Sequence, residues 1–169
     1  TALGNWALDS GGFSELNLNG KWSINSQEYV TRVNKINNTP GLLWAAQQDW
    51  MCEPFVIEKT GLTIKEHQKR TVNNLIELRQ LDCEVPIIPV LQGYSLEDYK
   101  ECFELFEVNN IDLRSEPLVG LGSVCRRQNT NDIERIVKYC TTHKLNPTTK
   151  NCANCLQYAL EWRQKVINQ

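Results

Sequence analysis

Trp6-Ala-Leu-Asp-Ser-Gly-Gly-Phe13 joins a short apolar stretch to an acid, a hydroxyl and two glycines. The apolar residues predict a β-strand, which would fix the position of the Asp9 carboxylate at its end. The glycines can adopt backbone angles that other residues avoid, so the chain can turn sharply and leave room for a ligand against the main chain. The alternative interpretation is an ordinary tight turn in which Asp9 accepts hydrogen bonds from nearby amides.

The order of strand followed by helix repeats along the chain. Further strands are expected at Leu42 to Ala46, Pro86 to Leu91 and Leu118 to Val119. Apolar residues at helical spacing follow each strand. The expected helix starts are Ser26, Thr63 in a capping box with Glu66, Ser95, and Thr130 or Asn131. This alternation predicts an α/β fold with a parallel sheet and flanking helices.

Polar and glycine residues follow every expected strand: Asp9 and Ser10, then Gln47 to Asp49, then Gln92 and Gly93, then Gly120 to Ser123. The carboxyl ends of parallel strands share one edge of a sheet, and ligands bind there. Carboxylates, carboxamides and backbone groups freed by glycine can form paired hydrogen bonds to the edge of a flat heterocycle. The pattern therefore favours one site for a purine-like base over four separate turns.

Four segments resemble the tRNA-guanine transglycosylase superfamily, and more closely its DNA-directed branch of DpdA-like deazapurine transglycosylases. They are Ala7-Leu-Asp-Ser-Gly-Gly-Phe13, Gln48-Asp-Trp-Met-Cys-Glu-Pro54, Val90-Leu-Gln-Gly93 and Leu118-Val-Gly-Leu-Gly-Ser-Val-Cys-Arg-Arg127. The likeness runs from about Asn5 to Thr142 and resumes at Asn151. It implies part of a (β/α) TIM-type barrel. It also implies exchange of guanine for a 7-deazaguanine through a covalent link between an Asp and the sugar C1′.

The resemblance also implies roles for single residues. Asp9 would act in general acid/base chemistry, Asp49 would hold the Watson-Crick edge of the base, and Gln92 would contact its exocyclic oxygen. The implied substrate-binding residues are Ser10, Asp49, Gln92, Gly93, Gly120 and Leu121. The spacing around Asp49 differs from that of the tRNA enzymes.

The chain also departs from the family pattern. A complete barrel needs roughly 250 residues, whereas this chain has 169. Residues 1–145 are expected to form an incomplete barrel, on which a CxxC segment at 146–169 would pack. The segment that carries the nucleophile in relatives is not found, because no acidic residue lies between His143 and Gln157. The chain would then be a fragment, a short gene product, or a form completed by another copy in a homo-oligomer.

Three functions therefore stay open: base exchange on DNA, the same chemistry on tRNA, and a non-catalytic remnant that binds a base. A net charge of −2 argues against a nonspecific nucleic-acid coat. Arg126 and Arg127 are the expected local phosphate patch, with a solvated start of a helix as the alternative. No apolar run approaches the roughly 20 residues that span a bilayer, so we expect a cytoplasmic protein without membrane contact.

Seven cysteines leave at least one thiol unpaired and do not indicate a disulfide framework. The spacing of Cys152 and Cys155 would allow two thiolates to bind one tetrahedral metal ion, and Cys140 and His143 could complete the set. The tRNA-directed relatives carry such a structural zinc. A structural zinc and free thiols are the two interpretations. His67, inside an expected helix, is predicted to be a surface residue.

Overall fold

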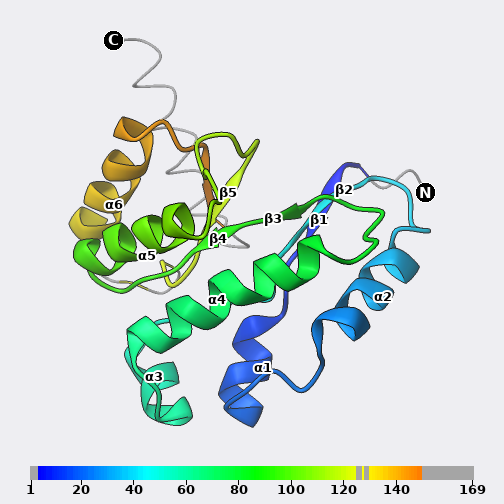
Figure 1. Cartoon of the computed structure of the whole chain (residues 1–169), viewed down its shortest axis with the longest axis horizontal. Helices are drawn as coiled ribbons and strands as arrows, with labels where there is room; N and C mark the ends of the chain where they lie inside the picture. The colour runs from blue at the N-terminus through cyan, green and yellow to red at the C-terminus, as the bar shows by residue number, and fades with distance from the viewer. Residues whose placement is uncertain (1–3, 125–126, 128–129, 150–169) are drawn as a thin grey trace.

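The computed structural model describes residues 4–124, 127 and 130–149. Short strands and helices alternate along these residues (Figure 1). In chain order they are β1 (Trp6–Leu8), α1 (Gly12–Asn19), α2 (Ser26–Ile36), β2 (Leu42–Ala46), α3 (Pro54–Thr60), α4 (Ile64–Arg79), β3 (Ile87–Ile88), β4 (Val90–Leu91), α5 (Leu96–Val108), β5 (Val119–Leu121), α6 (Thr130–Thr142) and β6 (Pro147–Thr149). The predicted α/β class is confirmed.

Every strand pairing is parallel and follows the order of the chain. One sheet has the order β1-β2-β3 and the other β4-β5-β6. The two sheets meet at Pro89, which separates β3 from β4 and has no N–H to donate to a ladder. Within the part of the chain that the structure describes, the strands do not close into a barrel. The expected barrel type is therefore not confirmed.

Side-chain caps fix where three helices begin. Asn25 and Glu28 form a reciprocal capping box at the start of α2, so Asn25, and not Ser26, is the cap. Ser95 caps α5 in the same way, with Asp98 as its partner. Thr63 caps α4 by accepting a hydrogen bond from the Glu66 N–H at 3.1 Å. The sequence predicted the position of each of these helices.

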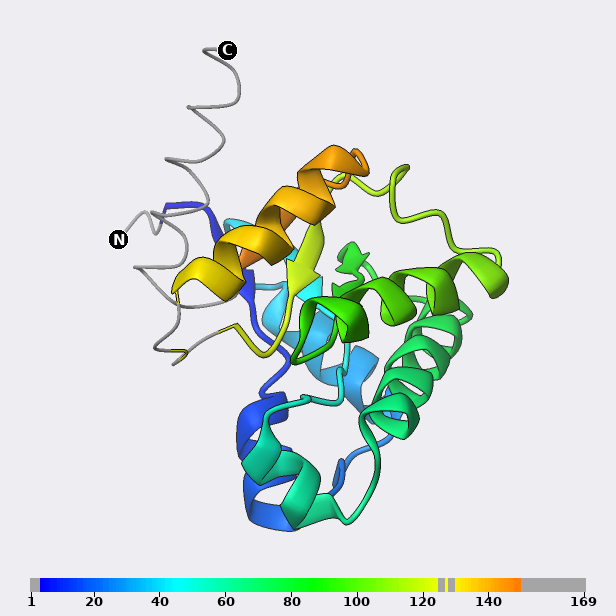
Figure 2. The same ribbon diagram turned by 90° about the vertical axis from the view of Figure 1, so that its left-hand side faces the viewer.

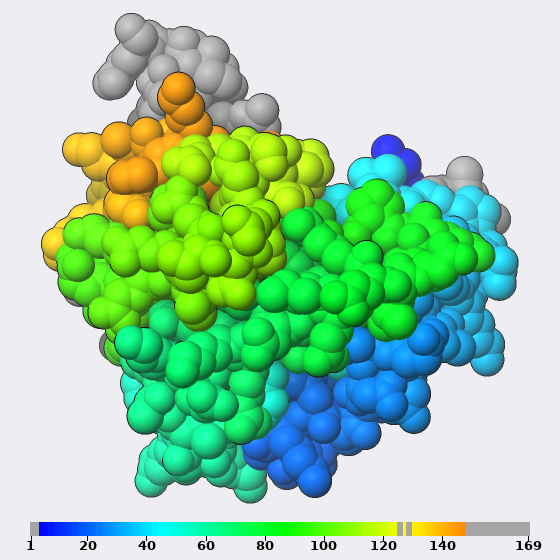
Figure 3. All heavy atoms as spheres, viewed as in Figure 1, coloured from blue at the N-terminus to red at the C-terminus, as the bar shows by residue number. Residues whose placement is uncertain are grey.

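The helices cover the strands with the apolar faces that their spacing predicts. The largest core cluster joins α5 and α6 to β4 and β5, and includes the fully buried Tyr99, Phe106 and Cys140. Figure 2 shows α6 and α5 stacked over these strands, with α4 beside α5. A second cluster packs Tyr29 and Val33 of α2 against β2. The helix α4 packs between α2 and α5 and fills the middle of the face seen in Figure 3.

Three elements were not predicted. The short helices α1 and α3 pack against each other beyond the carboxyl ends of β1 and β2 (Figure 1). The third is β6, which pairs in parallel with β5 and so continues the sheet past residue 145. Among the described residues, no helix is both long and apolar enough to cross a membrane.

Candidate functional site

Four loops that follow different strands meet at one buried cluster of polar side chains. Ser10 follows β1, Asp49 follows β2, Gln92 follows β4 and Ser123 follows β5. We name these four residues, together with Glu53, the polar cluster. Because parallel strands end at the same edge, loops that are far apart in sequence deliver their side chains to one place.

Asp49 is the centre of the polar cluster. The Ser10 hydroxyl donates to Asp49 Oδ1 at 2.8 Å, and Gln92 Nε2 donates to Asp49 Oδ2 at 2.5 Å. Asp49 is 3% exposed and Gln92 is 0% exposed. Buried carboxylates need such donors, since an ionised group without them is costly to remove from water. The structure thus brings together Ser10, Asp49 and Gln92, the residues that the strand-end argument placed at one edge.

Glu53 and Ser123 complete the polar cluster. Ser123 ends the segment Gly120 to Ser123 that was expected at the strand ends, whereas Glu53 was not among the predicted site residues. Ser123 Oγ lies 2.6 Å from Glu53 Oε2 and 2.8 Å from Gln92 Oε1, and it accepts a hydrogen bond from the Cys52 N–H at 2.8 Å. Burial raises the pKa of the Glu53 carboxyl above its usual value, and the negative charge of Asp49 adds to this. The signal in the sequence is an acid directly before Pro54, since proline at the first turn marks a helix start beside the strand end.

Asp9 lies half-buried directly after β1, in the same loop as Ser10. Its charge reaches the phenol of Tyr29, whose hydroxyl donates to the Ala46 carbonyl at 2.5 Å. Burial, followed by the charges of Asp49 and Asp9, raises the pKa of Tyr29. The phenol therefore stays a neutral donor. Because the charges of Asp9 and Asp49 both act on Tyr29, these two carboxylates lie on the same side of the sheet edge.

The loop after β1 approaches the backbone of Asp49 closely, and this requires a glycine. A Cβ at Gly12 would lie 3.2 Å from the Asp49 carbonyl oxygen and 3.3 Å from the ring of Trp22. The indole of Trp22 donates to that same carbonyl at 3.2 Å. The Gly12 N–H in turn donates to Ser10 Oγ at 3.3 Å, which orients the hydroxyl toward Asp49.

The other predicted binding residues lie beside the polar cluster. Gly93 abuts the first turn of α5, where an added Cβ would lie 2.8 Å from the Tyr99 nitrogen. Gly120 and Leu121 lie within β5, not beyond its end, and the Gly120 N–H donates to the Pro89 carbonyl at 2.8 Å. The Leu121 side chain is part of the apolar core. In this segment it is Ser123 that reaches Asp49 through Gln92.

Arg127 does not form an open surface patch. Its side chain is 9% exposed, and its guanidinium lies 4.5 Å from the centre of the Tyr94 ring. One guanidinium nitrogen, Nη2, is 3.9 Å from the Asp132 carboxylate, whereas the buried Nη1 has no hydrogen-bond partner in the described part of the chain. Arg126 lies outside the described residues, so the phosphate patch stays a prediction.

The predicted zinc ligands lie only partly within the described residues. Cys140 is buried in the apolar core, and burial raises the pKa of its thiol to about 12. The exposed His143 has its Nδ1 2.8 Å from the Tyr139 carbonyl oxygen. No group of three or more His, Cys, Asp and Glu residues suited to a metal ion occurs in the described ranges. Cys152 and Cys155 lie outside them, so zinc stays a prediction.

The prediction of a surface His67 is wrong. Its ring is fully buried between the loop after β2 and the end of α3, with Nδ1 2.6 Å from the Met51 carbonyl oxygen and Nε2 2.8 Å from Thr60 Oγ1. Burial lowers the pKa of this imidazole, which favours the neutral ring. His67 lies on the face of α4 that is covered by the end of α3 and the loop before α3.

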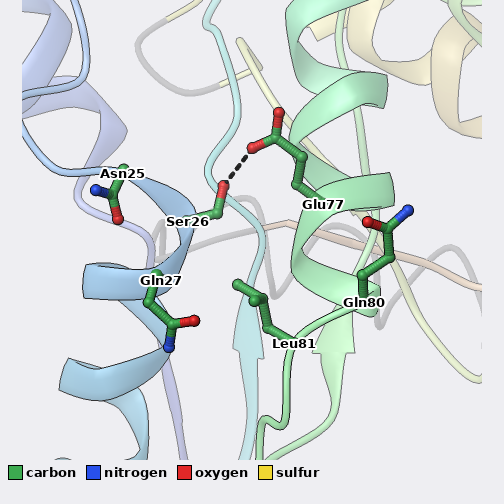
Figure 4. Close-up of a pocket in the computed structure, with 6 residues that line it drawn as sticks. All are labelled: Asn25, Ser26, Gln27, Glu77, Gln80 and Leu81. Atoms are coloured by element: carbon green, nitrogen blue, oxygen red, sulfur yellow. Dashed lines mark hydrogen bonds between the residues drawn. The ribbon is translucent and has the colours of Figure 1, made fainter.

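A surface pocket of about 300 Å³ lies between α2 and α4, away from the polar cluster (Figure 4). The Ser26 hydroxyl at its rim donates to the Glu77 carboxylate at 2.8 Å. The pocket is lined by Asn25, Ser26, Gln27, Glu77, Gln80 and Leu81. None of these follows the end of a strand, so the pocket is a groove between helices and separate from the predicted base site.

Comparison with known proteins identifies the family. No curated protein and no solved structure matches the chain. A family model described as "DeoxyPurine in DNA protein A" (DpdA) matches residues 1–144, which include the whole polar cluster. Such membership links the chain to purine modification in DNA and to transglycosylase-like chemistry. Because this match covers most of the chain, it shows that the chain belongs to the DpdA family.

Proposed function

We propose that this chain takes part in replacing guanine in DNA with a 7-deazaguanine, and that the polar cluster holds the base. Two observations support the proposal. The family match spans 144 of 169 residues, and Asp49 and Gln92 lie side by side at the edge where parallel strands end. The second observation carries the proposal, because it supplies a carboxylate and a carboxamide in adjacent positions.

The chemistry of guanine matches this pair. The Asp49 carboxylate accepts hydrogen bonds, as the N1–H and 2-amino group of guanine require, and Gln92 Nε2 donates, as the 6-oxygen requires. In the structure these two groups bond to each other, so a base would enter by taking over their hydrogen bonds. Ser10 keeps Asp49 oriented through its own donor. Asp9, one residue earlier, is the proposed acid/base group.

We further propose that the strands are part of a TIM-type barrel. Within each sheet they pair in parallel and in chain order, which is the order within such a barrel, and helices connect all consecutive strands except β3 and β4, which only Pro89 separates. In such barrels, substrates bind at the carboxyl ends of the strands, where the polar cluster lies.

DNA is the proposed polymer, because the matching family is described by deoxypurine in DNA. The same base site would serve a tRNA substrate, so the polymer must be tested separately from the base. Duplex DNA and tRNA carrying guanine are compared for exchange with labelled 7-deazaguanine. Label in DNA alone supports the proposal, and label in tRNA alone contradicts the choice of polymer.

Base binding is tested with the Asp49→Asn substitution. The substitution replaces an acceptor-only group by one that also presents N–H donors to guanine N1–H. Loss of hydrogen bonds to a charged group costs about 1.5–3 kcal/mol, so guanine should bind roughly ten- to a hundredfold more weakly. Fluorescence of Trp22, whose indole bonds to the Asp49 carbonyl, reports the binding.

Asp82→Asn is the matched control, since Asp82 is exposed and lies between α4 and β3, outside the polar cluster. It should bind guanine as the wild-type chain does. Equal guanine affinity of Asp49→Asn and the wild type would remove Asp49 from the base site. Equal binding of guanine and adenine by the wild type would contradict selection through the Watson-Crick edge.

A further inference from the structure

Four side chains of the polar cluster form a continuous hydrogen-bonded chain between two carboxyl groups. Asp49 Oδ2 is 2.5 Å from Gln92 Nε2, Gln92 Oε1 is 2.8 Å from Ser123 Oγ, and Ser123 Oγ is 2.6 Å from Glu53 Oε2. All four residues are buried. Each of these three short contacts needs one hydrogen atom between its two heavy atoms.

The available hydrogens do not suffice when both acids are ionised. The Gln92 amide donates only from Nε2 and accepts only at Oε1, so it supplies one hydrogen to the chain. The Ser123 hydroxyl supplies one more. Two hydrogens cannot fill three contacts, and therefore one of the two carboxyl groups carries a proton. This count holds for either orientation of the Gln92 amide, because turning the amide only moves the missing hydrogen from one end to the other.

The orientation of the Gln92 amide, with Nε2 toward Asp49 and Oε1 toward Ser123, places that proton on Glu53. Both oxygens of Asp49 already accept, Oδ1 from the Ser10 hydroxyl and Oδ2 from Gln92 Nε2. Ser123 accepts from the Cys52 N–H, so its remaining lone pair can accept from a protonated Glu53 while its own hydrogen points to Gln92. In this arrangement the hydroxyl uses all of its hydrogen-bonding capacity.

The charges and titratable groups around Glu53 act in both directions. Burial is the largest effect and raises the pKa of Glu53, the hydrogen bond with Ser123 lowers it, and the charge of Asp49 from the loop after β2 raises it. Arg127 lowers it. Among the described residues, Cys52 and Tyr99 also feel the charge of Glu53, and burial holds both of them neutral. The net pKa is raised, in agreement with the hydrogen count.

We propose that Glu53 is a positioning residue that selects a 6-oxopurine, because its proton, acting through Ser123, keeps Gln92 Nε2 turned toward the base. This rests on the proposed function. With Glu53 protonated, the site presents an N–H donor from Gln92 beside the acceptor oxygens of Asp49, the complement of guanine O6 and N1–H. When Glu53 loses its proton, Ser123 donates to Glu53 instead. The Gln92 amide then turns Oε1 toward the base, where it repels O6.

The test compares guanine binding by the wild type and by Glu53→Gln across about pH 4.5 to 8. Wild-type affinity should fall about tenfold or more as the pH rises through the Glu53 titration, which is the effect of one lost hydrogen bond to a charged site. Glu53→Gln keeps a permanent N–H donor to Ser123, so its affinity should stay at the low-pH wild-type value. The Asp82→Asn control should follow the wild type. A Glu53→Gln chain that titrates as the wild type does, or that binds weakly at every pH, would overturn the proposal.

Infrared spectra locate the proton without any ligand. The difference spectrum between the wild type and Glu53→Gln should show one carbonyl band of a protonated carboxylic acid, lost over the same pH interval as guanine affinity, because the other carboxyl groups contribute equally to both chains. If no variant binds guanine, the proposed function fails. A difference spectrum without this band refutes the proton on Glu53 itself.

Discussion

Replacing Gly122 by alanine should disrupt the polar cluster, because the added methyl group would displace the Gln92 side chain. A Cβ at this position would lie 2.0 Å from Gln92 Nε2, 2.4 Å from its Cδ and 2.7 Å from its Oε1. The backbone at Gly122 can shift little to relieve this clash, because the Gly122 N–H donates to the Leu91 carbonyl at 3.0 Å. The Gln92 side chain is fully buried, so its amide must leave its position to admit the methyl group.

The cost follows from the contacts that move with the amide. The bond from Nε2 to the Asp49 carboxylate is worth about 1.5–3 kcal/mol, and the bond between Oε1 and Ser123 about 0.5–1.5 kcal/mol. Together they amount to about 2–4.5 kcal/mol, a large part of the roughly 5–15 kcal/mol by which domains are stable. The Gly122→Ala chain should therefore unfold at a clearly lower urea concentration, and its guanine binding should be lost.

A double-mutant cycle separates the clash from other effects. In a Gln92→Ala background the methyl group at residue 122 has no amide to displace, so Gly122→Ala should cost no more than about 0.5 kcal/mol there. Gly4→Ala is the matched control, since nothing lies within 4 Å of its added Cβ. Urea unfolding followed by circular dichroism gives all four free energies. Equal costs in both backgrounds, or a Gly122→Ala chain as stable as the wild type, would refute the reasoning.

Two other predictions concern titration and metal. Because burial lowers the pKa of His67, the free energy of unfolding should decrease as the pH falls below about 6.5, where the unfolded chain takes up a proton that the folded ring refuses. Ring resonances of His67 that titrate at or above the ordinary histidine range would contradict this. If Cys152 and Cys155 hold zinc, elemental analysis should find it in stoichiometric amount, and Cys152→Ser should lower both metal content and stability. Cys83→Ser, outside the predicted ligand set, is the control, and purified wild type without zinc would refute the site.

The longer elements could be predicted because their periodicity is strong. In α2 and α5 the apolar residues recur at helical spacing and a capping box marks each start. The helices α1 and α3 were not predicted, because each is short and begins in a loop of mixed composition. Their packing against each other stabilises them. The strand β6 has no apolar run, and its pairing with β5 depends on contacts distant in sequence.

The candidate site was predictable to the extent that a strand end specifies it. Ser10, Asp49 and Gln92 could be placed at one edge since each lies within three residues of the end of an apolar strand. Glu53 lies further along its loop, and only the fold shows that the chain turns back to bring it to Ser123. His67 was misplaced for a related reason: a polar residue in a helix looks solvent-exposed until the segment that covers it is known.

The gap between the two sheets has a consequence for the base site. At Pro89 the backbone ladder from β2 stops, and the buried Gln47 side chain takes its place, accepting from the Val90 N–H at 2.9 Å and donating to the Thr71 carbonyl at 2.6 Å. Ser10 and Asp49 extend from one side of this seam, and Gln92 and Ser123 from the other. A base bound by both Asp49 and Gln92 would bridge the two sheets. Binding of the base would therefore be coupled to the rigidity of one sheet relative to the other.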